Sequence, residues 1–286
     1  MATMATPTSP DAFGLDVLGV APQSVIPTAL IIQATSKAGH VEGDDPAVRV
    51  PAINLDASVG FVPEGADIPE ADPDLAEVVI LTGKVAELIK VSREQLSQPS
   101  AMEVISHEIR RSLIAKADWA LLQQPAPTPP VQYPPAGLLS KATDAGEIAD
   151  NLDALVDVIA DIEGLPGGVA THIIAHPLAY AAVRKLKKST GSNESLVGAG
   201  VEAGQKSLLS VPVLTTAAMP VDQIAVLDKN QVLSAYGNVL LARSNDFYFG
   251  SDNVALRATF RFGAGFIEPK AVQVLTVAGD VEEDED

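Results

Sequence analysis

Two strand-forming segments in this chain flank a long acidic stretch. The segments AVRVPAINL (47–55) and LAEVVILTGKVAELIKV (75–91) lie on either side of FVPEGADIPEAD (61–72), which has four acids and no base. Runs rich in Val, Ile and Leu that are separated by Pro, Gly and Asp are typical of a β-hairpin. The sequence therefore predicts a long hairpin that holds an acidic loop out between its two strands.

A long amphipathic helix is predicted directly after the hairpin. Capping-box spacings occur at 92–95 and 100–103, and such spacings mark the start of a helix. Apolar residues then recur at steps of three or four, at Met102, Ile105, Ile109, Leu113, Ala117 and Leu121. This spacing predicts one helix of roughly twenty residues or more with a single apolar face. The proline-rich segment 123–137 cannot continue the helix and marks a boundary.

The rest of the chain predicts a mixed α/β unit over about 137–247 and a closing strand. A second amphipathic helix is expected to open at Asp144 and to end at Gly164, with an inward face of Ile148, Leu152, Leu155, Val156 and Ile159. The closing strand alternates between an apolar and a basic face, with Leu256, Ala258, Phe260 and Phe262 against Arg257, Thr259 and Arg261. Residues 1–35 show no sustained period and predict an extended arm rather than a packed element.

Charge and composition exclude several classes of function. A net charge of −18 argues against sequence-specific binding to nucleic acid, because an acidic surface repels phosphate groups. No run approaches the roughly 18 apolar residues of a membrane span, and the N-terminus lacks the features of a signal peptide, so we expect a soluble, unexported protein. The absence of cysteine excludes disulfides, thiolate zinc sites and cysteine nucleophiles.

No set of residues in the sequence predicts catalysis or cofactor binding. The glycines of 198–204 are spaced one residue too widely for a dinucleotide fingerprint, and no Walker A sequence occurs. His172 and His176 fall on a predicted strand, where side chains four residues apart are separated by about 13 Å and cannot share one metal. We therefore predict no enzymatic activity, no cofactor and no metal site.

Seven short segments occur in an order that is typical of one family. They are FVPEG at 61–65; KVA at 84–86 leading to VSREQL at 91–96; KADWAL at 116–121; AHP at 175–177; LKK at 186–188 before Gly191; VPV at 211–213; and the stretch from Arg261 to Pro269. In this order, the chain resembles the major capsid proteins of tailed phages, whose shell fold is shared with encapsulins. The resemblance covers roughly residues 22–278.

The resemblance implies an α+β fold of the phage major capsid type. Its parts would be an N-terminal arm (1–35), an extended β-hairpin loop (48–85), a peripheral domain with a long spine helix (36–47, 86–136 and 248–278), an inserted axial α/β domain (137–247) and an acidic tail (279–286). In such proteins the arm and the hairpin lie across neighbouring subunits. A hairpin that protrudes alone is marginally stable in water, so its order is expected to come from the neighbour on which it lies.

The charges suggest which residues meet across the subunit interface. The hairpin has no base between Arg49 and Lys84, so its acids need a basic counterpart elsewhere. Our hypothesis pairs Glu64, Asp67, Glu70 and Asp72 of one subunit with Arg110, Arg111, Lys116, Arg257 and Arg261 of another. Each exposed pair contributes only about 0–1 kcal/mol, so the charges should set register more than strength. Reversal of Arg110 and Arg111 to Glu is expected to block assembly but not folding.

The resemblance implies a structural protein that self-assembles, as pentamers and hexamers, into an icosahedral virion shell around double-stranded DNA. Its expected partners are further copies of itself, a portal, and separate scaffolding or decoration proteins, and its expected place of assembly is the host cytoplasm. Some relatives join subunits through a lysine of the extended loop, but residues 50–83 contain no lysine and Thr259 stands in place of the helping glutamate, so we predict no covalent cross-links. An encapsulin-type compartment is the first alternative, and an α/β enzyme with an unrecognised site is the second.

Overall fold

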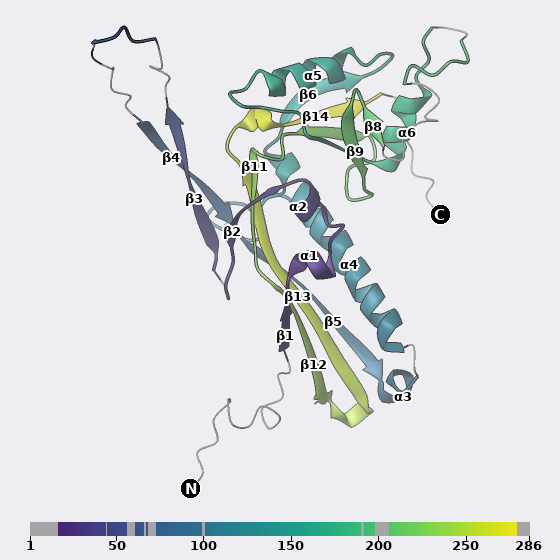
Figure 1. Ribbon diagram of the computed structural model, residues 1–286. Coiled ribbons are helices and arrows are strands. Elements are labelled where there is room, and N and C mark those ends of the chain that lie inside the picture. Colours follow the sequence, from purple (N-terminus) through teal and green to yellow (C-terminus); the bar gives the residue numbers. More distant parts are fainter. Residues whose placement is uncertain are drawn as a thin grey trace.

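The computed structural model describes residues 17–43, 45–55, 61–65, 67, 73–98, 101–189, 192–197 and 206–278. It has two six-stranded sheets, and a two-stranded hairpin projects away from both (Figure 1). The first sheet has the order β1 (Val17–Val20), β12 (Val239–Tyr248), β13 (Asn253–Phe266), β11 (Val232–Tyr236) and β2 (Ser36–His40), with β5 (Gly83–Ser92) on the other edge of β13. The second has the order β6 (Thr143–Ile148), β14 (Val272–Val277), β10 (Gln223–Leu227), β7 (His172–Ala175), β9 (Val211–Thr215) and β8 (Ser207–Leu208).

The largest core lies between the first sheet and the long helix α4 (Ala101–Gln123). Phe260 of β13 is fully buried there and stacks on Phe262, with ring centroids 5.2 Å apart. The helix contributes Leu113, Ala117 and Leu121 to the same cluster. Both the predicted long helix and the predicted apolar face of the closing strand are therefore confirmed.

The short helix α3 (Arg93–Leu96) connects β5 to α4. The predicted capping box at its start is present, because the Ser92 hydroxyl accepts a hydrogen bond from the Glu94 amide and the Gln95 side chain accepts one from the Ser92 amide. The strand-to-helix turn at the far end of the sheet is thus specified locally by the sequence.

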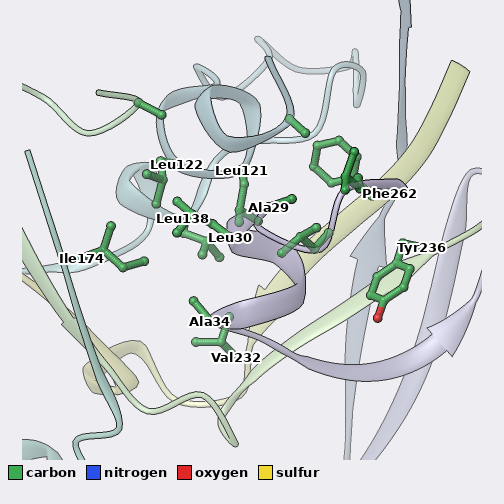
Figure 2. Close-up of a cluster of buried hydrophobic side chains, with 14 of the residues drawn as sticks. Ala29, Leu30, Ala34, Leu121, Leu122, Leu138, Ile174, Val232, Tyr236 and Phe262 are labelled. Carbon is green, nitrogen blue, oxygen red and sulfur yellow. The ribbon is translucent and has the colours of Figure 1, made fainter. Parts of the chain in front are cut away.

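The segment after β1 packs into the core, and the prediction of an unpacked arm is wrong for residues 21–35. Helices α1 (Pro22–Val25) and α2 (Leu30–Gln33) bury Ile26, Leu30 and Ile31 almost completely. Leu30 lies beside Leu121 of α4 in the cluster drawn in Figure 2. The Leu30 amide also donates a 2.8 Å hydrogen bond to the buried Asp118 carboxylate of α4. Residues 1–16 of the predicted arm lie outside the described residues.

A second core supports the second sheet. Helices α5 (Asp153–Glu163) and α6 (Pro177–Lys185) pack on this sheet, and Leu155, Ile162 and Val183 lie fully buried against Ile173 and Ile224. Three short 3₁₀ segments complete the described structure: Leu138–Ser140, Phe249–Ser251 and Pro269–Ala271. This second unit is the mixed α/β unit that the sequence predicts after the proline-rich segment.

The helix predicted to open at Asp144 begins later, because residues 143–148 form strand β6. Gly146 adopts a positive φ of +93°, which a helix cannot contain, and the Asp144 carboxylate accepts a hydrogen bond from its amide. Ile148 is buried, but as part of strand β6 and not of a helix. Val156 of α5, which was expected to face inward, is 48% exposed. The predicted helix end at Gly164 is confirmed as the C-cap of α5.

The two sheets divide the chain differently from the single insertion expected at 137–247. Strands β11 and β12, which lie inside that range, pair with β13 in the first sheet. Strand β14 lies inside the expected peripheral range 248–278 but pairs with β10 and β6 in the second sheet. The chain therefore crosses between the two units more often than the predicted boundaries allow.

Strands β3 (Ala47–Leu55) and β4 (Pro73–Leu81) form the predicted hairpin, with nine antiparallel pairs between them. The hairpin leaves the body at its base and stands clear of both sheets (Figure 1). Its base packs against the first sheet, where Ile80 is fully buried. The contact is close because Gly263 of β13 has no side chain: an added Cβ would lie 2.0 Å from the Leu81 carbonyl oxygen.

Gly263→Ala is therefore expected to push the hairpin base away from β13. The substitution should lower the free energy of unfolding by about 1–3 kcal/mol, as other forced overpacking does. Urea unfolding of the subunit measures this change, and Gly250→Ala is the matched control because an added Cβ there meets nothing within 4 Å. Equal stability of the two variants would contradict the close contact.

Candidate assembly interface

The far part of the hairpin presents apolar and acidic side chains to solvent. Phe61 has a relative exposure of 108%, and Val62 of 37%. Glu64 and Asp67 are both exposed as well. The other two predicted hairpin acids, Glu70 and Asp72, lie outside the described residues.

Near the base of the hairpin, one basic residue pairs with one of the hairpin's acids. Arg49 of β3 forms a 3.1 Å ion pair with Glu77 of β4, and both side chains are substantially exposed. No lysine or arginine follows until Lys84. The acids beyond this pair therefore have no base on the hairpin itself.

One face of the first sheet is basic, and we name it the basic sheet face after Lys84, Arg257 and Arg261. Lys84 of β5 stands directly opposite Arg261 of β13, and directly opposite residues in a sheet point to the same face. Arg257 lies on that face too, because side chains alternate along a strand. The face turned the other way holds Phe260 and packs on α4, so the basic face lies on the side of the sheet that α4 does not cover.

A groove of about 610 Å³ runs over the basic sheet face. Its described lining includes all three bases together with His40, Thr259 and the acid Glu42. Arg257 is exposed. Arg261 is partly committed to its own subunit, because its guanidinium donates hydrogen bonds to the Asp45 carbonyl at 3.2 Å and the Thr82 hydroxyl at 3.0 Å at the hairpin base.

The remaining predicted bases, Arg110, Arg111 and Lys116, are exposed on α4. The Arg111 guanidinium donates to the Glu108 carboxylate at 2.6 Å, and this hydrogen bond lowers the pKa of Glu108. The Lys116 ammonium lies 3.7 Å from the ring centroid of Trp119. The structure therefore separates the predicted bases into two surfaces, one on α4 and one on the opposite face of the sheet.

Sequence reasoning did not include Lys84 among the candidate bases. In the sequence, Lys84 ends the stretch without bases, and nothing near it in the sequence indicates a basic surface. Its partner across the sheet, Arg261, is 177 positions away, and only strand pairing brings the two together. Exposed and less exposed side chains alternate along β5, and this alternation places Lys84 on an exposed face together with Ala86, Leu88 and Lys90. The same alternation could have indicated Lys84 as a surface base.

The two histidines considered as metal ligands have structural positions. His172 opens β7, and burial and then Lys229 lower its pKa. His176 is the N-cap of α6, where its Nδ1 accepts a hydrogen bond from the Leu178 amide. Within the described ranges, no helix is both long and apolar enough to cross a bilayer.

Comparison with known proteins identifies the family. The model of the phage capsid family matches residues 33–277, so the chain belongs to this family and is a structural subunit of a capsid. This match favours a phage capsid over the encapsulin alternative. A search of curated protein sequences finds no match.

Solved structures share the fold at low sequence identity. One from Gordonia phage Cozz has a TM-score of 0.68 at 15% identity, covering 88% of this chain and 87% of the other. The capsid of an empty GTA particle computed with C5 symmetry has a TM-score of 0.66 at 19% identity, covering 88% and 90%. A structure from Mycobacterium phage Bobi has a TM-score of 0.63 at 16% identity, covering 98% and 96%.

Proposed function

We propose that copies of this chain assemble, as pentamers and hexamers, into an icosahedral virion shell around double-stranded DNA. The observation that carries the proposal is a projecting hairpin whose acids have no local base, on a chain that has a basic sheet face elsewhere. A surface and its complement at two different places on one chain produce head-to-tail contacts, and such contacts form rings where the rotation between subunits closes. The hairpin of each subunit would lie on the basic sheet face of the next.

The net charge of −18 is compatible with this role. A shell that encloses DNA without reading its sequence needs no basic inner wall, and an acidic wall does not retain the genome. Assembly in the host cytoplasm, a portal, and separate scaffolding or decoration proteins belong to the same proposal. Membership of the family is what supports these parts of the proposal.

Electron microscopy and gel filtration of the purified chain test the proposal. Capsomers or closed particles are expected, and co-purified DNA in particles from infected cells would distinguish a virion shell from a compartment that holds cargo protein. A fixed small oligomer that never forms particles would refute the proposal. A variant in which residues 53–75 are replaced by a two-residue Asn-Gly turn is the control, because it keeps the buried base of the hairpin and should fold yet remain unassembled.

We further propose that the shell has no covalent cross-links between subunits. Residues 50–83 contain no lysine, so the far part of the hairpin has no amine to join to a neighbour. Assembled particles boiled in detergent are expected to run as a single band of about 30 kDa, the mass of one 29.7 kDa chain. A ladder of multimers in that gel would overturn this part of the proposal.

A further inference from the structure

An apolar pocket of about 360 Å³ lies where α4, β5 and β13 meet the proline-rich segment. Leu121 and Phe262 line it from the core side, and Tyr133, Pro134 and Pro135 line it from the segment. An apolar cavity of about 150 Å³ already holds benzene, so this pocket has room for an aromatic ring.

The proline-rich segment forms the outer wall of the pocket. The Tyr133 hydroxyl donates a 3.3 Å hydrogen bond to the Lys84 carbonyl, and Pro135 packs so closely on Gly83 that an added Cβ there would lie 2.7 Å away. These contacts hold the proline-rich segment against strand β5. The segment, predicted only as a boundary, has a structural role in shaping this pocket.

Lys116 of α4 and Lys84, whose side chain lies on the basic sheet face at the edge strand β5, both line the mostly apolar pocket, together with the polar Gln124 and Tyr133. Both lysines are exposed, and none of the described residues that line the pocket is an acid. An apolar pocket with two cations suits an occupant that combines an apolar anchor with nearby carboxylates.

Phe61 has these properties. Of the six phenylalanines in the described ranges, Phe260 and Phe262 are buried and Phe266 is partly buried, whereas Phe61, Phe247 and Phe249 are exposed. Exposed aromatic side chains on a projecting segment are typical anchors of protein interfaces. Phe61 is followed by Val62 and by two exposed acids, Glu64 and Asp67.

A subunit cannot fill its own pocket with Phe61. The pocket includes Gly83 and Lys84, which follow the hairpin base directly, whereas Phe61 lies beyond the far end of the hairpin. Nine paired residues at about 3.3 Å each place the two roughly 25–30 Å apart. The occupant must therefore come from another copy.

Lys84 and Ala86 line both this pocket and the groove on the basic sheet face. The two hollows therefore adjoin at β5. A hairpin that lies in the groove can place its carboxylates beside the bases and its aromatic ring in the pocket at the same time.

We propose that the pocket between α4, β5 and the proline-rich segment is the receptor for Phe61 of a neighbouring copy of this chain. The inference rests on the proposed function and specifies the contact that anchors the hairpin. Phe247 and Phe249 fit less well, because the acids beside them share their hairpin with Arg243, whereas Phe61 lies in a stretch without any base.

Site-directed cross-linking tests the proposal without background, because the chain has no cysteine. Chains with Phe61→Cys are mixed, as a minor fraction, with an excess of tagged chains that carry Ala120→Cys in the pocket wall. After assembly and treatment with a short bis-maleimide reagent, a mixed dimer of tagged and untagged chains is expected. Such a dimer cannot arise within one subunit.

Two control variants separate the outcomes. Phe249→Cys, at a residue that is 78% exposed on another projecting turn, and Val156→Cys in place of Ala120→Cys should give no mixed dimer. Particles without a mixed dimer at Phe61, or with one at Phe249, would overturn the pocket assignment and leave the shell proposal intact. Failure of the unmodified chain to form particles would refute the shell proposal, and this inference with it.

A second measurement does not depend on the reagent. Phe61→Ala should raise the concentration of chain needed for half-maximal assembly by at least about tenfold, as truncation of an interface anchor does. Phe61→Tyr, which keeps the ring, should restore most of the loss. An unchanged threshold for Phe61→Ala would also overturn the assignment.

Discussion

Lys84→Glu combined with Arg257→Glu is expected to abolish particle formation while the subunit stays folded. Both side chains are exposed on the sheet face that α4 does not cover, so their reversal removes no core contact. Each native pair contributes only about 0–1 kcal/mol, but like charges placed face to face cost several kcal/mol. That cost recurs at every copy of the interface. Gel filtration and electron microscopy report assembly, and circular dichroism reports the fold.

Two further sets of substitutions test whether the hairpin of a neighbouring subunit lies on the basic sheet face. Adding Glu64→Lys and Asp67→Lys to the double reversal restores opposite charges across the interface and should restore particles. The structure changes the sequence-based expectation that Arg110→Glu with Arg111→Glu blocks assembly. Both residues lie on the other side of the sheet, and Arg111 is already paired with Glu108 in its own subunit, so this reversal should have the smaller effect. If only the reversal of Arg110 and Arg111 blocked assembly, the hairpin of the neighbouring subunit would lie on that part of α4 and not on the basic sheet face.

Elements that depend on local pattern were predictable from the sequence. The hairpin, α4 and the alternating face of β13 have regular apolar spacing and clear start signals, and all three are present. The packing of residues 21–35 was not predictable in this way. Its helices have four residues each and no periodicity, and their order comes from contacts with α4, such as the hydrogen bond from Leu30 to Asp118.

Local sequence patterns also gave incorrect predictions at two places. Asp144 and Glu147 have the spacing of a helix start, but parallel pairing with β14 makes the segment a strand. The sequence alone does not divide the five predicted bases, yet α4 and the open face of β13 lie on opposite sides of the same sheet. Which bases share a surface depends on strand order, and strand order is set by contacts between residues far apart in the sequence.

Asp118→Asn is expected to stabilise the subunit at pH 8 by up to about 3 kcal/mol. Asp118 is 6% exposed, and burial raises its pKa from 3.8 to about 6, while the hydrogen bond from the Leu30 amide acts in the opposite direction. Its folded-state pKa therefore lies above the unfolded value, so the folded state holds the proton more tightly. Protonation stabilises the fold fully below about pH 4, and this contribution is lost as the pH rises through 6. About two pKa units at 1.36 kcal/mol each give the expected size.

Urea unfolding at pH 8, 6 and 4.5, on subunits kept too dilute to assemble, measures the difference between Asp118→Asn and the unmodified chain. The difference should shrink steadily as the pH falls, because asparagine keeps the acceptor for the Leu30 amide but cannot ionise. Asp118→Ala is the informative comparison: it also removes the charge, but it leaves that amide without a partner, at a cost of about 1–3 kcal/mol. Alanine should therefore be less stable than asparagine at every pH. If the difference in free energy of unfolding between Asp118→Asn and the unmodified chain did not change with pH, the result would contradict a buried Asp118 carboxyl with a raised pKa.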